Sequence, residues 1–170
     1  MDNSTRRMIN SLAEDILNIY NIPVPIQDID EIVEKLGGTI QREVSFSDGT
    51  VEKNGEGFRI ILSPFQDEKR ERFTIAHELG HLFLHMGYRT NEKLWERQSD
   101  NIYHRIGNSE KEYQANEFAA AFLMPANKYL EVLKGLVVDN MVDTSEIANF
   151  FNVSVEAASN RGKFLGYLRW

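Results

Sequence analysis

The sequence predicts an α+β fold that is mostly helical and contains a small antiparallel sheet. Apolar residues recur every three or four positions through most of the chain, which is typical of helices. Only the segments 39–46 and 57–62 are rich in β-branched and aromatic residues, which is typical of strands. With 170 residues, of which 42% are hydrophobic, and no internal repeat, we expect one domain over 1–170. Its C-terminal part, roughly 141–170, is expected to form a helical subdomain.

Two helices are predicted before the strands. The first follows from apolar residues at helical spacing and ends at the two prolines of "NIPVPI". The second lies in "DIDEIVEKLGG", with Asp28 as its N-cap and Gly37 at its end. The apolar positions that define them are Met8, Leu12, Ile16 and Ile19 in the first helix, and Ile29, Ile32, Val33 and Leu36 in the second.

The strand segments 39–46 and 57–62 are separated by Gly, Asp and Asn residues, so they predict an antiparallel pair. Helical periodicity then begins after candidate N-caps at Ser63 and Asp67 and continues to Gly87. From Gly87 to Asn108 the sequence is polar and aperiodic, which predicts a long surface loop. Loops of this length are more often functional or mobile than idle.

Further helices are predicted in "SEKEYQANEFAAAFLM", ended by Pro125, and in "ANKYLEVLKG", ended by Gly135. The tail "DTSEIANFFNVSVEAASNRGKFLGYL" predicts a short helix, a tight turn and another helix, an order that resembles a helix-turn-helix. Its second helix carries Glu156 beside only Arg161 and Lys163, which is little positive charge for contacting phosphates. The tail is therefore expected to pack or to dock a repressor, with DNA binding as the rival function.

The composition restricts the classes of function. A net charge of -7 disfavours a protein that works mainly by binding nucleic acid. Because there is no cysteine, any metal ion must be held by His and carboxylate side chains. The N-terminus shows no export signal, and no apolar run approaches the ~18 residues needed to cross a bilayer. These features predict a cytoplasmic protein without a membrane anchor.

The stretch "RFTIAHELGHLFLH" contains an H-E-x-x-H pattern at His77, Glu78 and His81. On a helix, His77 and His81 lie one turn apart on one face, so that both imidazoles can bind one Zn²⁺ ion. Glu78 lies about 100° around the helix and can act as a general base toward a zinc-bound water, whose pKa zinc lowers toward ~7. This spacing predicts the active site of a zinc peptidase.

The alternative is that these histidines are hydrogen-bonded core residues without a metal. The apolar setting favours the metal site, because burying two imidazoles and a carboxylate without partners is costly. Gly80 points the same way, since a glycine inside a helix costs about 1 kcal/mol relative to alanine and indicates a close approach by another segment.

The third ligand must come from elsewhere in the chain. On a straight helix His85 lies ~12 Å from His77, too far for both to reach one ion, and is expected to be structural or to contact a ligand. Glu112 is favoured because Asn116, one turn later, can hydrogen-bond the free ring nitrogen of a zinc-bound histidine. Glu117 and His104 remain alternatives, and an S-x-x-E capping box with Ser109 is a rival role for Glu112.

"FTIAHELGHLFLH" followed by "EYQANEFAAAFLMP" resembles the ImmA/IrrE family of zinc metallopeptidases. The spacing of Glu112 and Asn116 is similar to the E-x-x-x-D arrangement of gluzincins. The resemblance implies a gluzincin-like metallopeptidase domain with one Zn²⁺ held by His77, His81 and Glu112, and with Glu78 as the catalytic carboxylate. Asn116 departs from the acidic residue that many gluzincins have beside the ligands.

The resemblance also implies the substrate, because ImmA-like members are anti-repressors that cut a helix-turn-helix repressor. Strand 58–62 is expected at the edge of the cleft, where it would bind an extended substrate by β-augmentation. Candidates for stabilising the oxyanion are Tyr103, His104 and Tyr113. The substrate's identity, the cleavage point, the activating signal and the oligomeric state stay open.

Overall fold

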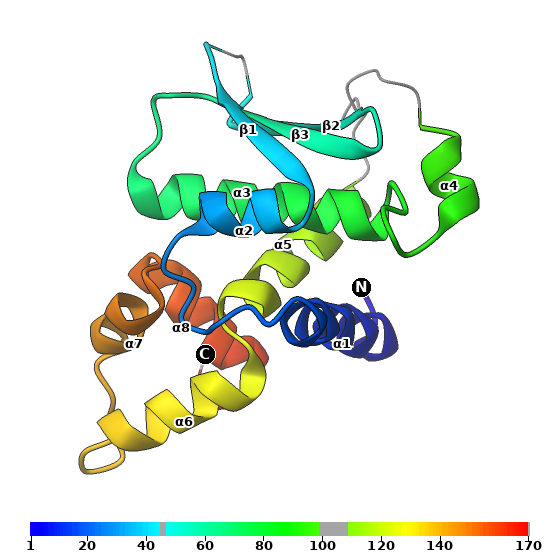
Figure 1. The fold of residues 1–170 in the computed structure, drawn as a ribbon. Coiled ribbons are helices and arrows are strands. Elements are labelled where there is room, and N and C mark those ends of the chain that lie inside the picture. Colours follow the sequence, from blue (N-terminus) through cyan, green and yellow to red (C-terminus); the bar gives the residue numbers. More distant parts are fainter. Residues whose placement is uncertain (45–46, 99–108, 170) are drawn as a thin grey trace.

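The computed structural model describes residues 1–44, 47–98 and 109–169. A small sheet lies on one side of the long helix α3 (Glu68–Leu84), and α5 (Ser109–Leu123) crosses on the other side (Figure 1). Helix α1 (Asn3–Ile19) packs beside α5, whereas α2 (Ile29–Lys35) leads into the sheet. The C-terminal helices α6 (Ala126–Leu136), α7 (Thr144–Phe151) and α8 (Val155–Phe164) gather at the end opposite the sheet. The predicted mostly helical α+β class is confirmed.

The sheet is mixed, with the strand order β1-β3-β2. Strand β1 (Gly38–Arg42) runs parallel to β3 (Gly57–Leu62), and β2 (Gly49–Asn54) runs antiparallel to β3. The prediction of an antiparallel pair between 39–46 and 57–62 is therefore wrong. Strand β2 was not predicted, because its residues Glu52, Lys53 and Asn54 are not typical of strands.

Glu52 explains how so polar a strand is stabilised. Its side chain is buried and pairs with Arg59, the residue directly opposite it on β3. Opposite charges on facing positions of neighbouring strands stabilise their pairing. This cross-strand pair is visible only when the register is known.

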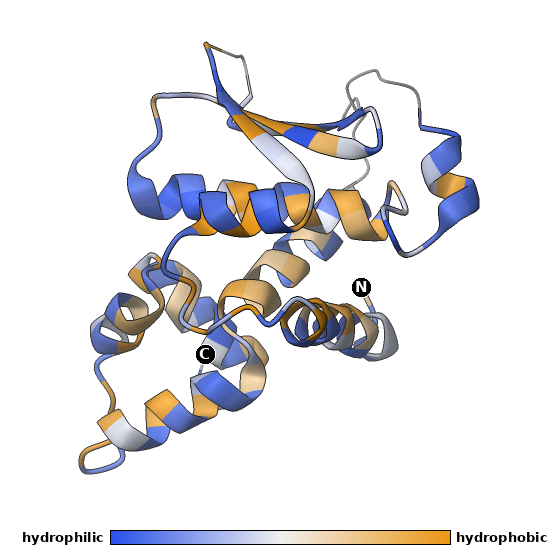
Figure 2. Cartoon of the chain, in the orientation of Figure 1, coloured by the Kyte–Doolittle hydropathy of each residue, from blue (hydrophilic) through white to orange (hydrophobic). Residues whose placement is uncertain are grey.

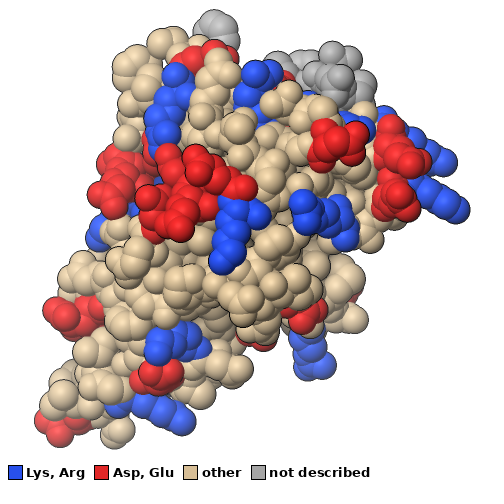
Figure 3. Space-filling view, in the orientation of Figure 1, with Lys and Arg blue, Asp and Glu red and all other residues tan. Residues whose placement is uncertain are grey.

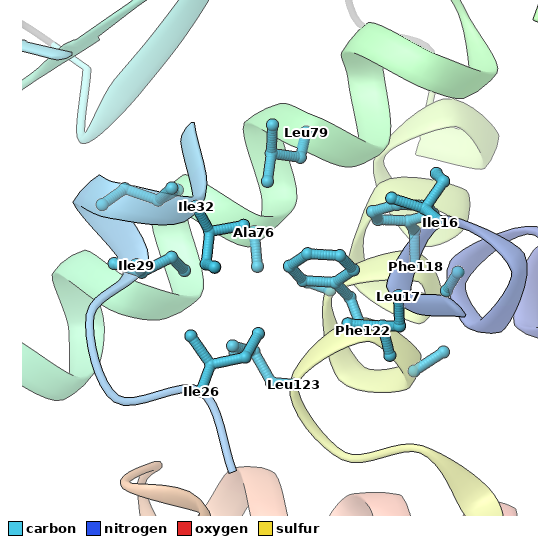
Figure 4. Packing of buried hydrophobic residues seen from close by; sticks show 14 of the residues in the cluster. Ile16, Leu17, Ile26, Ile29, Ile32, Ala76, Leu79, Phe118, Phe122 and Leu123 are labelled. Carbon is cyan, nitrogen blue, oxygen red and sulfur yellow. The ribbon is translucent and has the colours of Figure 1, made fainter. Parts of the chain in front are cut away.

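The core extends from the sheet to the C-terminal helices, and Figure 4 shows the part of it that lies between α1, α2, α3 and α5. Phe118 and Phe122 of α5 stack with ring centroids 5.7 Å apart, and Ile16 and Leu17 of α1 lie beside them. Along α3, Ala76 and Leu79 complete this packing and are fully buried. The first turns of α3 are hydrophilic and its middle is hydrophobic (Figure 2), so the polar H-E-x-x-H residues lie within the apolar part of the helix.

The N-terminal helices begin and end largely as predicted. Asp28 caps α2 by accepting a hydrogen bond from the Glu31 amide, 3.1 Å away, and the four predicted apolar positions after it are buried. In α1, however, Met8 and Ile19 are exposed, because the buried stripe runs one position later. That stripe comprises Ile9, Ala13, Ile16 and Leu17.

The predicted boundaries of the later helices are correct with two exceptions. The predicted loop from Gly87 to Asn108 contains the short helix α4 (Glu92–Glu96), and its part at 99–108 lies outside the described residues. Gly135 lies within α6 rather than ending it. Helices α7 and α8 are joined by a tight turn in which Asn152 adopts a left-handed conformation, with φ of 51°. Among the described residues, no helix is long and apolar enough to cross a membrane.

Candidate metal centre

The middle of α3 buries the three polar residues of the H-E-x-x-H pattern. Asp67 starts this helix by accepting a hydrogen bond from the Arg70 amide at 3.0 Å. The helix then runs without interruption through His77, Glu78 and His81, whose exposed fractions are 9%, 1% and 1%. Helical spacing turns both imidazoles toward the same point, and their Nε2 atoms are 3.0 Å apart.

Glu112 of α5 faces both rings. Its two carboxylate oxygens lie 3.3 Å from His77 Nε2 and 3.3 Å from His81 Nε2. A tetrahedral ion with ligands at about 2.0–2.1 Å separates neighbouring ligand atoms by about 3.3 Å, so the three side chains have the spacing that such an ion requires. Their chemistry also fits, since two imidazoles and one carboxylate are ligands typical of zinc sites with an open coordination position. The group of His77, His81 and Glu112 can therefore hold a metal ion.

The rival third ligands lie elsewhere or outside the described residues. Glu117 points to the opposite side of α5, where its carboxylate is 3.1 Å from Arg161 Nη1 and 3.3 Å from Arg6 Nε. It also accepts a hydrogen bond from Asn10 at 2.7 Å. His104 falls outside the described residues, as does Tyr103. The third candidate for stabilising an oxyanion, Tyr113, is 64% exposed on α5 next to Glu112.

Both histidine rings make a second contact through their other nitrogen. His77 Nδ1 lies 2.8 Å from Asn116 Oδ1, the partner that the sequence analysis expected. His81 Nδ1 lies 2.9 Å from Nδ1 of His85, whose Nε2 in turn lies 3.0 Å from Gln114 Oε1. Burial lowers the pKa of His85, although its hydrogen bond to Gln114 acts in the opposite direction. Gln114 was not singled out from the sequence.

The side chain of Glu78 lies between the backbone of α3 and strand β2 of the sheet. A Cβ atom added to Gly49, the first residue of β2, would lie 3.3 Å from both Cγ and Oε1 of Glu78 and 2.5 Å from Cγ2 of Thr74. The absence of a side chain at residue 49 thus leaves room for the glutamate. Because β2 was missed, the sequence offered no signal that this glycine adjoins the site.

A cavity of about 940 Å³ lies along the interface between α3 and α5 and extends to α8. Phe73, one turn before His77, lines it together with Tyr113 and Asn116 of α5 and Phe164 of α8. Tyr113 and Phe164 are large apolar side chains with exposed fractions of 64% and 48%. Exposed apolar surface beside a polar site is typical of ligand-binding clefts.

Helix α8 directs its arginine into the protein. The Arg161 side chain is buried, with Nε donating to the Met124 carbonyl at 3.0 Å and Nη2 donating to Asn10 Oδ1 at 2.7 Å. Burial lowers the pKa of Arg161, and the nearby carboxylate of Glu117 counteracts this effect. On the face shown in Figure 3, acidic and basic side chains are interspersed, and the largest acidic group lies over α2. The described residues on that face form no continuous basic surface for a phosphate backbone.

Comparisons with known proteins agree with this fold. Residues 27–163 match the Peptidase_M78 family, described as the IrrE N-terminal-like domain. This match covers most of the sequence, and the chain belongs to that family. The protein is therefore a member of a metallopeptidase-like family, as the resemblance in its sequence indicated.

A solved structure of a Mycobacterium tuberculosis transcriptional regulator has a similar fold, with a TM-score of 0.57 and 15% sequence identity. The similarity covers 91% of this chain and 46% of that chain, so this chain spans about half the length of the regulator. No curated protein matches.

Proposed function

We propose that this protein is a zinc-dependent endopeptidase that cleaves a helix-turn-helix transcriptional repressor at a specific site. The observation that carries the proposal is the convergence of His77, His81 and Glu112 from two helices, at separations of 3.0–3.3 Å. A gluzincin-like arrangement of this kind leaves a coordination position for water, whereas a purely structural zinc site usually has four protein ligands.

Each residue of the site has a distinct role in the proposed reaction. A zinc ion, when bound, supplies Lewis acidity that lowers the pKa of water toward ~7 and polarises the scissile carbonyl. Glu78 takes the proton from the attacking water and later transfers it to the leaving amine, so that both proton transfers use one carboxylate. His77 and His81 act as neutral ligands through Nε2, which requires their hydrogens to be on Nδ1.

The sheet provides a binding edge for the substrate, but not at strand 58–62 as expected from the sequence. That segment is β3, which pairs on both sides and has no free edge within the sheet. Among the strands that the structure describes, β2 lies at an edge of the sheet, and its first residue, Gly49, adjoins Glu78. We propose that an extended substrate segment pairs with β2, and that the cavity along α3 and α5 takes apolar side chains of the same segment.

A repressor as substrate is supported by the family resemblance and by the similarity to a transcriptional regulator. The second candidate is a DNA-binding or repressor-binding regulator with a catalytically silent metal site. Its DNA-binding form is disfavoured because Arg161 of α8 is buried and paired with Glu117. A regulator with a catalytically silent metal site is disfavoured because a structural metal site has no need for a carboxylate such as Glu78 beside the ligands.

The decisive experiment tests whether zinc-loaded protein, with and without a chelator, cleaves a candidate helix-turn-helix repressor, such as one encoded beside this gene. The matched variants are Glu78→Gln, which retains the ligands, and Glu131→Gln, which changes an exposed glutamate of α6 far from the metal centre. We expect wild type and Glu131→Gln to cleave, and chelated protein and Glu78→Gln to be inactive. Equal cleavage by all variants would show that Glu78 is not the base, and repressor binding without cleavage would favour the regulator.

A further inference from the structure

A chain of hydrogen bonds connects the proposed ligand His81 to a side-chain amide on the other helix. From α3 it runs through Nδ1 of His81 to Nδ1 of His85 at 2.9 Å, and from Nε2 of His85 to Oε1 of Gln114 on α5 at 3.0 Å. The two rings are tilted by 53° with centroids 5.1 Å apart, so they meet nitrogen to nitrogen rather than by stacking. His85 and Gln114 are neither ligands nor proton carriers in the proposed reaction.

The direction of this chain determines which nitrogen of His81 carries hydrogen. An amide oxygen only accepts, so Gln114 Oε1 requires a hydrogen on His85 Nε2. Neutral His85 then has a lone pair on Nδ1, which accepts the hydrogen of His81 Nδ1. His81 Nε2 then carries no hydrogen and presents its lone pair toward His77 and Glu112.

If the side-chain amide of Gln114 were rotated so that its oxygen and nitrogen exchanged places, His81 would adopt the opposite tautomer. If the NH₂ group of Gln114 faced His85, it would donate to Nε2, and the hydrogen of His85 would move to Nδ1. His81 Nδ1 would then accept, and its own hydrogen would occupy Nε2, where it blocks metal binding. The orientation of one glutamine side chain is thus coupled through His85 to the state of a ligand atom.

His77 makes a shorter contact of the same kind, because its Nδ1 meets Oδ1 of Asn116 directly. The hydrogen bonds behind both imidazoles therefore lead to neutral side-chain amides, Asn116 for His77 and Gln114 for His81. The outer partner of a metal-bound histidine is often a carboxylate instead. A carboxylate strengthens the donor character of the imidazole more than an amide does, since its hydrogen bond is charge-assisted.

We propose that His85 and Gln114 are positioning residues that hold His81 in its metal-binding tautomer, and that the amide end at Gln114 sets a lower metal affinity than a carboxylate would. This inference rests on the proposed zinc site, because it assigns a function to the contacts behind one of its ligands. It extends the site from three residues to a connected group on α3 and α5.

Zinc affinity of the full chain, measured by competition with a chromogenic chelator, tests the proposal without any substrate. Gln114→Leu and His85→Phe should weaken zinc binding by about 10–100-fold. Gln114→Glu should restore the acceptor and tighten binding beyond wild type. Gln27→Leu, which changes a glutamine far along the chain from the metal centre, should leave the affinity unchanged. Circular dichroism of the chelated proteins shows whether each variant folds.

Nitrogen-15 NMR of the zinc-loaded wild type provides a second readout that does not depend on any variant. We expect His85 to be neutral with its hydrogen on Nε2 and His81 to carry its hydrogen on Nδ1. A hydrogen on Nδ1 of His85, or an affinity of folded Gln114→Leu within about twofold of wild type, would overturn the inference and leave the zinc site intact. A wild type that binds no zinc would overturn the proposed function as well.

Discussion

Gly80 of α3 lies so close to Ala115 of α5 that a Cβ atom on residue 80 would be 3.0 Å from the Cα atom and the carbonyl oxygen of Ala115. The sequence had indicated a close approach at this glycine, and α5 is the segment that makes it. The obstacle is backbone, which cannot rotate aside as a side chain can. The spacing of the two helices, and with it the position of Glu112, thus depends on residue 80.

Gly80→Ala should therefore weaken zinc binding by at least about tenfold, a loss comparable to removing an outer contact of a ligand. It should also lower the melting temperature of the metal-free protein, although alanine alone favours a helix by about 1 kcal/mol. Gly135→Ala is the matched control, since no atom of the described part of the chain lies within 4 Å of a Cβ atom there and the helix should gain stability. Unchanged zinc affinity in Gly80→Ala would show that the helix spacing does not determine the site.

Gly49→Ala tests the room that β2 leaves for Glu78. The new methyl group would lie 2.5 Å from Thr74 Cγ2 and 3.3 Å from the glutamate, so we expect displacement of Glu78. Repressor cleavage should fall by about 10-fold or more, as expected when a catalytic group is misplaced, while zinc affinity is retained. The double variant with Thr74→Ser removes the methyl that clashes and keeps the hydroxyl that donates to Gln66, so it should recover part of the activity. Without such recovery, the clash with Thr74 is not the cause.

Two glutamates of α5, Glu117 and Glu112, should separate metal binding from stability. Glu117→Gln leaves buried Arg161 without its carboxylate, so we expect a loss of about 3 kcal/mol in the free energy of unfolding and a melting temperature lower by about 6–12 °C. Its zinc affinity should remain within a few-fold of wild type. Glu112→Gln should do the reverse, losing zinc affinity while the metal-free protein unfolds at the wild-type temperature. Calorimetry of metal-free protein and zinc titration distinguish the two, and an exchange of these phenotypes would refute the assignment.

Tyr129 should make stability depend on pH in the alkaline range. Its hydroxyl donates to the Ala158 carbonyl at 2.7 Å between α6 and α8, and burial raises the pKa of Tyr129 to about 12 from 10.0. Between these values the unfolded chain loses the proton and the folded protein keeps it. The free energy of unfolding should therefore fall as the pH rises from about 10 to 12, by up to about 2 kcal/mol from this residue.

Tyr129→Phe is the control for this pH effect. At pH 8 it should be less stable than wild type by about 1 kcal/mol, because the Ala158 carbonyl loses its donor. Urea unfolding at several pH values should show this difference shrinking above pH 10. A difference that stays constant up to pH 11.5 would contradict the assigned burial of the hydroxyl.

The sequence predicted best what depends on residues near one another in the chain. His77, Glu78 and His81 were recognised because helical spacing alone brings two imidazoles to one face. Glu112 lies 31 positions beyond His81, and only the amide one turn after it distinguished it from Glu117. The structure now separates these two glutamates by the side of α5 on which each lies.

The sequence predicted least about the elements whose position depends on pairing between segments that are distant in the chain. Strand β2 depends on the pairing of Glu52 with Arg59 on β3. Because β2 was not predicted, nothing in the sequence indicated that β1 pairs with β3 in parallel. In α1 the apolar residues offer two overlapping stripes, and contact with α5 selects the one that contains Ile9 and Ala13. Local spacing cannot choose between such alternatives.

Helix α5 has different tasks on its two sides. One side presents Glu112 and Asn116 to His77 and His81 of α3, and Gln114 contacts His85. Glu117 is held against the arginines of α1 and α8. Its rotation about its own axis is therefore fixed from both directions. Loss of the contact between Arg161 and Glu117 would remove one of these two constraints.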